Sequence, residues 1–189
     1  MNGSFIQTAG LWLAAMALMM PPMALPTLTL LRRACRSPAL AWGFAGGYAG
    51  VCLGFGLLLA GVQPALRSAG WPQPAAAILL LTSGLYQFSA WKAACLQRCR
   101  SPLRQLLALR QPGWQGGLEL GWRYGAHCLG CCWALMLTML GAGMMTPAAM
   151  LAITLLLAGE RLLAFDPRTV AHANGILLVI WALLTGTPP

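Results

Sequence analysis

Six long apolar runs, separated by short loops that carry most of the charge, divide this chain. The runs cover about residues 5–31, 39–62, 74–91, 117–140, 147–163 and 169–185. A helix needs roughly 20 apolar residues to cross a bilayer core, and isolated strands in lipid would leave backbone groups without hydrogen bonds. The sequence therefore predicts an all-α fold, in which residues 1–189 form a single integral membrane domain: a polytopic membrane helix bundle of about six transmembrane helices with short loops.

The composition excludes most soluble folds. Of the 189 residues, 59% are hydrophobic and 8% are charged, whereas about 25% are charged in a typical soluble domain. The acidic residues are Glu119, Glu160 and Asp166, which are too few to cover a soluble surface. The first run is interpreted as a retained span, because it lacks a preceding basic segment and is longer than the apolar core of a signal peptide.

The basic residues divide unevenly between the loops. Arg67 alone lies on one side, and Arg123 lies within the fourth run. The first, third and fifth loops hold the other ten: Arg32, Arg33, Arg36, Lys92, Arg98, Arg100, Arg104, Arg110, Arg161 and Arg168. By the positive-inside rule these loops are cytoplasmic, so both termini are expected on the periplasmic side of a bacterial inner (plasma) membrane.

The net charge of +9 is accordingly interpreted as a membrane feature. Basic loops orient the chain and attract anionic headgroups. They lack the interleaved aromatic side chains that would bind bases, so we expect the lipid bilayer and no nucleic acid as a partner. Residues 92–116, which are rich in arginine and broken at Pro102, are expected to form a segment at the cytoplasmic interface.

The strongest chemical signal lies in the fourth run, as the string His127-Cys128-Leu129-Gly130-Cys131-Cys132-Trp133. On a helix, residues three or four apart share a face, so Cys128 would meet Cys131 and Cys132, and His127 would meet Cys131. Gly130 leaves room for a group close to the backbone. Seven cysteines, mostly in or beside apolar runs, do not fit a secreted disulfide framework. Thiols and imidazole are instead a ligand set for soft metals.

Further sulfur atoms extend this prediction. Methionines lie beside three prolines in the first run, and Cys95 and Cys99 lie one helical turn apart at the cytoplasmic mouth. Uncharged thioethers suit a monovalent soft ion, which favours Cu(I), with Zn(II) as the alternative. The predicted metal-binding residues are Cys128, Cys131, Cys132, His127, Met19, Met20, Met23, Cys95 and Cys99. Cysteine and methionine also pack as ordinary buried hydrophobic residues, and that alternative stays open.

Other polar residues in the runs have simpler interpretations. Glu119 and Arg123 are spaced as an ion pair on one helix, and Glu160 is expected to pair with Arg161 or with an incoming basic loop. No role is assigned to Glu160, Arg123 or His172. Serine–histidine–acid sets, carboxylate pairs and phosphate-binding loops are missing from the sequence. This favours a role without chemical turnover and predicts no catalytic residues.

Several strings resemble a known family, the bacterial predicted metal-binding integral membrane proteins. They are Gly84-Leu85-Tyr86-Gln87, Lys92-Ala93-Ala94-Cys95-Leu96, Cys99-Arg100-Ser101-Pro102, the string from Cys128 to Met136, and Met19-Met20 with its nearby proline. The resemblance covers about Leu11 to Arg161, whereas the last run and its linker carry no motif of the family. It implies a metal-binding membrane protein.

Three hypotheses follow. The first is a membrane protein that binds Cu(I) and transfers, stores or delivers it, with a metalloprotein as recipient. The second is a thiol–disulfide membrane oxidoreductase, which would need accessible thiolates. The third is a structural subunit of a larger membrane complex, which the glycine-rich second run and the short loops would also fit.

Overall fold

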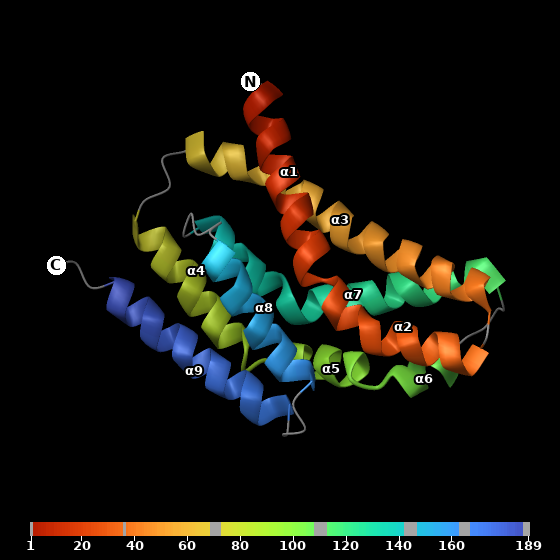
Figure 1. Ribbon diagram of the computed structural model, residues 1–189. Coiled ribbons are helices and arrows are strands. Elements are labelled where there is room, and N and C mark those ends of the chain that lie inside the picture. The colour runs from red at the N-terminus through yellow and green to blue at the C-terminus, as the bar shows by residue number, and fades with distance from the viewer. Residues whose placement is uncertain are drawn as a thin grey trace.

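The computed structural model describes residues 2–35, 37–68, 73–107, 113–141, 147–162 and 167–186. Across these ranges the chain is all-α, as predicted, and contains no strand (Figure 1). The helices are α1 (Asn2–Met19), α2 (Pro21–Cys35), α3 (Pro38–Ser68), α4 (Gln73–Tyr86), α5 (Ala90–Cys99), α6 (Pro102–Leu107), α7 (Gly113–Gly141), α8 (Pro147–Leu162) and α9 (Pro167–Gly186).

Successive long helices run in opposite directions in Figure 1. The start of α1 and the end of α3 lie at the top, α7 and α9 end at the left, α4 and α8 end near the lower centre, and α2 ends at the lower right. Arg32 and Arg33 end α2, Arg98 lies in the last turn of α5, and Arg168 opens α9. The basic residues thus gather at one end of the bundle. The side chains of Arg36, Arg67, Arg110 and Arg161 lie outside the described residues.

The first predicted span is broken rather than continuous. Pro21 and Pro22 lack amide protons and disfavour a helical residue before them, and the axes of α1 and α2 differ by 45° across Met20. Two tyrosine hydroxyl groups donate to carbonyl oxygens at the break, Tyr48 to Met20 and Tyr124 to Met23, each at 2.9 Å. In an apolar environment such bonds satisfy backbone groups that a broken helix leaves open.

The third predicted span also ends earlier than expected. Helix α4 stops at Tyr86, a turn follows, and the Ser89 side chain accepts a hydrogen bond from the Lys92 amide to begin α5. The helix therefore breaks inside the predicted run 74–91, because the capping serine starts a new helix. The rest of the interfacial segment holds α5, α6 and the start of α7, and its residues 108–112 lie outside the described residues.

Membrane-spanning character is clear for only part of the described chain. Within it, residues Pro38–Ala65 of α3 are long and apolar enough to cross a bilayer, and α1 with α2 would qualify together as one bent span. The apolar parts of α4, α8 and α9 are shorter: Ala77–Tyr86, Met150–Glu160 and Arg168–Leu183. The six-span topology therefore stays a prediction.

Helices α3 and α7 approach each other so closely that side chains are excluded between them. A Cβ atom added to Gly43 or Gly47 of α3 would collide with the backbone of α7, and one added to Gly117 or Gly121 of α7 would collide with that of α3. Small residues allow this approach between helices in lipid. Gly50 and Gly54 of α3 do not take part, because a Cβ atom at either would meet nothing within 4 Å.

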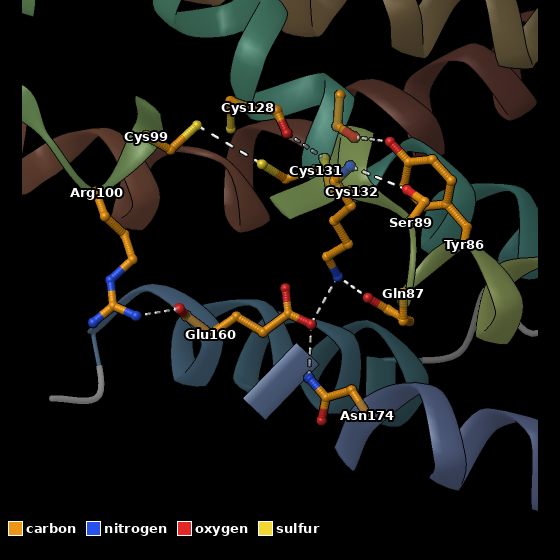
Figure 2. A network of polar contacts seen from close by, with 12 residues as sticks. Tyr86, Gln87, Ser89, Cys99, Arg100, Cys128, Cys131, Cys132, Glu160 and Asn174 are labelled. Carbon is orange, nitrogen blue, oxygen red and sulfur yellow. Dashed lines mark hydrogen bonds and ion pairs between the residues drawn. The ribbon is translucent and has the colours of Figure 1, made fainter. Parts of the chain in front are cut away.

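A buried ionic network joins α5 to α8 and α9. The ammonium group of Lys92 donates to Glu160 at 2.8 Å and to Gln87 in the turn before α5. Asn174 of α9 donates to the same Glu160 oxygen at 2.8 Å (Figure 2). Lys92 and Glu160 are both buried. The partner of Glu160 is thus Lys92, a residue of the third loop of the chain, which is one of the three basic loops. A desolvated ion pair therefore fixes α5 to the bundle.

Replacing Gly121 by alanine should destabilise the bundle by about 1–3 kcal/mol, because the new methyl group has no space beside the Phe44 backbone. The melting temperature of the detergent-solubilised protein, followed by near-UV circular dichroism, measures this. Gly54→Ala is the control and should leave stability unchanged or raise it. Equal melting temperatures for G121A and G54A would contradict the described contact.

Replacing Glu160 by glutamine should destabilise the protein by about 3–5 kcal/mol, because it leaves the Lys92 charge buried without a counter-ion. Glu119→Gln is the matched control. Glu119 and Arg123 are 3.7 Å apart and about half exposed, so their pair contributes at most about 1 kcal/mol. Chemical unfolding in detergent compares the two variants, and a smaller effect for E160Q than for E119Q would refute the buried pair.

Candidate metal centre

Helix α7 carries three buried thiols, which point to different neighbours. Cys128, Cys131 and Cys132 are each about 1% exposed. The helix also forms the close contact with α3 and packs against α4 and α5. The direction of each thiol therefore depends on which helix lies beside that part of α7.

Cys131 faces α5. Its sulfur lies 3.9 Å from the sulfur of Cys99 (Figure 2). A Cβ atom at Gly130 would lie 2.8 Å from the Cys95 sulfur, so the glycine lets that thiol approach α7. Cys95 and Cys99 are four residues apart on α5 and share a face. We call Cys95, Cys99 and Cys131 the thiol cluster.

Cys128 faces the break between α1 and α2. Its thiol donates to the Met20 sulfur at 3.9 Å and lies 3.3 Å from the Tyr48 hydroxyl oxygen. Tyr48 also donates to the Met20 carbonyl oxygen. The tyrosine therefore holds the thioether and the thiol together. We call Met20 and Cys128 the thioether pair, and Tyr48 is the side chain that contacts both.

The third thiol of α7 is bonded within its own helix. The Cys132 thiol donates to the carbonyl oxygen of Cys128 at 3.2 Å and contacts that of Leu129 at 3.7 Å. Thiols placed four residues after a carbonyl group make such bonds within a helix. Cys132 therefore lies apart from the thiol cluster.

The histidine is also bonded elsewhere. His127 Nδ1 lies 2.5 Å from the Arg123 carbonyl oxygen, and His127 Nε2 lies 2.8 Å from the Arg98 guanidinium group. A guanidinium group has no acceptor, so Nε2 accepts and Nδ1 carries the proton. His127 is thus bonded to a backbone carbonyl group and to a guanidinium group.

The predicted methionines are all buried, with different contacts. Met20 meets Cys128, and Met23 offers its carbonyl oxygen to Tyr124. Met19 is 1% exposed within the core. Of these three thioethers, Met20 has the described contact with a thiol.

The donor atoms meet in small sets. Within the described residues, no group of three or more histidine, cysteine, aspartate or glutamate side chains is placed to hold a metal ion. Structural zinc sites use four ligands in a closed tetrahedron. The sulfur–sulfur contacts seen here bring together thiol and thioether atoms, which are ligand types for soft metals.

Sequence reasoning missed Tyr48 beside these sulfur atoms and the specific partners of Lys92 away from them. Tyr48 was not singled out, although its hydroxyl group contacts both donors of the thioether pair. Glu160 was not linked to Lys92 in particular, because the two residues are 68 positions apart in the sequence. The contact of Lys92 with Gln87 was not expected either. The available signal for Tyr48 was a hydroxyl-bearing side chain within a glycine-rich apolar run.

The buried thiol–thiol and thiol–thioether contacts of this helical bundle supply the ligand types used by proteins that handle soft metals. A family model described as PpoB2, copper chaperone, matches residues 9–185. The chain therefore belongs to this copper chaperone family and has a copper-related metal-handling role. The match includes α9, which the motif resemblance did not cover. Searches among curated proteins and solved structures found no match.

The burial of the thiols makes a direct prediction. Cys35 is exposed, whereas the other six cysteines are buried and all seven are free. In the folded protein, a bulky maleimide should rapidly modify Cys35 alone, and in sodium dodecyl sulfate it should modify all seven. Mass spectrometry counts the adducts. Cys35→Ser should abolish the fast reaction, and rapid modification of a second thiol would contradict the described packing.

Proposed function

We propose that this protein is an integral membrane copper chaperone that carries Cu(I) as its cargo on sulfur ligands. The observation that carries the proposal is the contact between Cys99 and Cys131, with the Cys95 sulfur beside the neighbouring Gly130. Two thiols, one from α5 and one from α7, meet there, and neither forms a disulfide. Thiolates prefer Cu(I) to hard cations, and each thiol that binds the ion releases its proton.

The thioether pair provides a second position for the ion. Cys128 and Cys131 lie one turn apart on α7, with Met20 on the far side of Cys128. In this proposal the ion passes between the two positions by ligand exchange. A proton leaves each thiol that takes the ion and returns to each thiol that gives it up. Met19, Met23 and His127 line the route without being primary ligands, and Cys132 stays bonded within α7.

The membrane location is part of the same proposal. Large apolar side chains are exposed on several helices, including Leu18 (69%), Trp42 (63%) and Leu155 (62%). Exposed apolar surface of this extent favours a lipid environment. The basic residues at one end of the bundle favour a cytoplasmic location for that end and periplasmic termini. A metalloprotein that receives the copper is the expected partner.

Copper retention tests the proposal. The full chain is purified in detergent, loaded with Cu(I) and dialysed against a competing chelator, and the bound metal is measured by elemental analysis. Loss of a side chain that hydrogen-bonds a metal ligand already costs about 10-fold or more in affinity. Cys131→Ser and Cys99→Ser remove a proposed ligand itself and should lose at least that much. Cys35→Ser is the matched control and should bind like wild type.

Two results would contradict this assignment. Equal copper affinity in C131S and wild type would exclude the thiol cluster. Formation of a Cys99–Cys131 disulfide in the copper-free protein, with no copper retained after reduction, would favour the thiol–disulfide oxidoreductase. The near-UV circular dichroism spectrum of each variant, compared with that of wild type, shows whether the variant is folded, so that loss of copper binding is distinguished from unfolding.

A further inference from the structure

A basic pocket lies between α5, α6 and α7, beside the thiol cluster. It has a volume of about 450 Å³, and its wall includes Arg98, Arg104 and Arg123 with the polar side chains of Gln97 and Ser101. Glu119 contacts Arg123 from the same helix at 3.7 Å. The guanidinium groups outnumber this carboxylate, so the pocket is positively charged. Guanidinium groups bind phosphate through paired hydrogen bonds.

An apolar groove continues from this pocket. It has a volume of about 720 Å³ and shares Ala94, Arg98 and His127 with the basic pocket. Its walls are largely aromatic and aliphatic: Trp91, Trp122, Trp133, Phe55, Val51 and Leu129. Trp91 is 71% exposed and Trp122 is 60% exposed. Such an exposed apolar surface favours an apolar ligand.

The two parts follow the same order on both helices. On α7, Arg123 lines the pocket and Trp133 lines the groove, with His127 in both. On α5 the groove residue Trp91 comes earlier in the sequence than the pocket residue Ser101, which lies just past the helix. This is the spatial order of α7 read in the opposite chain direction. The contacts of Arg98 with His127 and of Cys95 with Gly130 confirm that the helices are antiparallel. The charged part therefore lies at the basic end of the bundle.

We propose that this pocket and groove bind one anionic phospholipid, with the phosphate among Arg98, Arg104 and Arg123 and an acyl chain along the tryptophans. Charge complementarity and the continuity of the two cavities select this ligand over a free anion or a neutral lipid. Cys95 and Gly130 line the groove, so the bound chain covers one side of the thiol cluster and shields it from water. The inference rests on the proposed membrane location, and it does not depend on copper binding.

Lipid titration tests the inference on the full, delipidated chain in detergent. Native mass spectrometry compares retained dioleoyl phosphatidylglycerol with dioleoyl phosphatidylcholine. Wild type should prefer phosphatidylglycerol, and R98Q/R104Q should lose about 10-fold to 30-fold of that affinity, from the contribution of each arginine near an anionic lipid. The charge-matched control R32Q/R33Q changes two arginines outside the pocket and should keep the preference. A126W, which fills the groove, should lower phosphatidylglycerol retention with all arginines present.

Four results would overturn the inference. They are equal retention of the two lipids by wild type, unchanged retention in R98Q/R104Q, an equal loss in R32Q/R33Q, and a thermal stabilisation by inorganic phosphate as large as that by phosphatidylglycerol. Copper retention is measured on the same variants. Wild type that binds copper but shows no lipid preference would contradict only the lipid site. Loss of copper binding in C131S with an unchanged lipid preference would bear only on the thiol cluster.

Discussion

The close contact of α3 and α7 is the constraint on which the rest of the structure depends. Glycines on both helices remove the side chains that would separate the two backbones. Tyr48 of α3 and Tyr124 of α7 then reach the broken first span together, and their rings lie 5.7 Å apart between centroids. With α7 fixed in this way, Cys128 faces Met20 while Cys131 faces α5.

The second constraint is electrostatic and acts on α5. Short helices are marginal alone, and α5 has ten residues. Lys92 ties it to Glu160 and Asn174 inside the protein. A buried charge without its partner is costly, so this pair holds the helix in one position and with it Cys95 and Cys99. The ionic network and the sulfur atoms are therefore structurally linked, although the charges do not touch the thiols.

Much of the fold could be predicted because its signals are local. Apolar runs and prolines predicted most helix boundaries to within a few residues, as for α8 and α9. The site was harder. Helical spacing placed Cys128, Cys131 and Cys132 on one face, but neighbours decide where each thiol points, and those neighbours are far away in sequence. Met20 is 108 residues from Cys128, and such contacts leave no periodic pattern.

The central claim is that sulfur atoms of α5 and α7 together hold Cu(I). X-ray absorption at the copper edge, measured on the copper-loaded full chain in detergent, tests it most directly. The account predicts the edge of monovalent copper and a first coordination shell made of sulfur alone. A shell of nitrogen or oxygen atoms, or the edge of divalent copper, would contradict it.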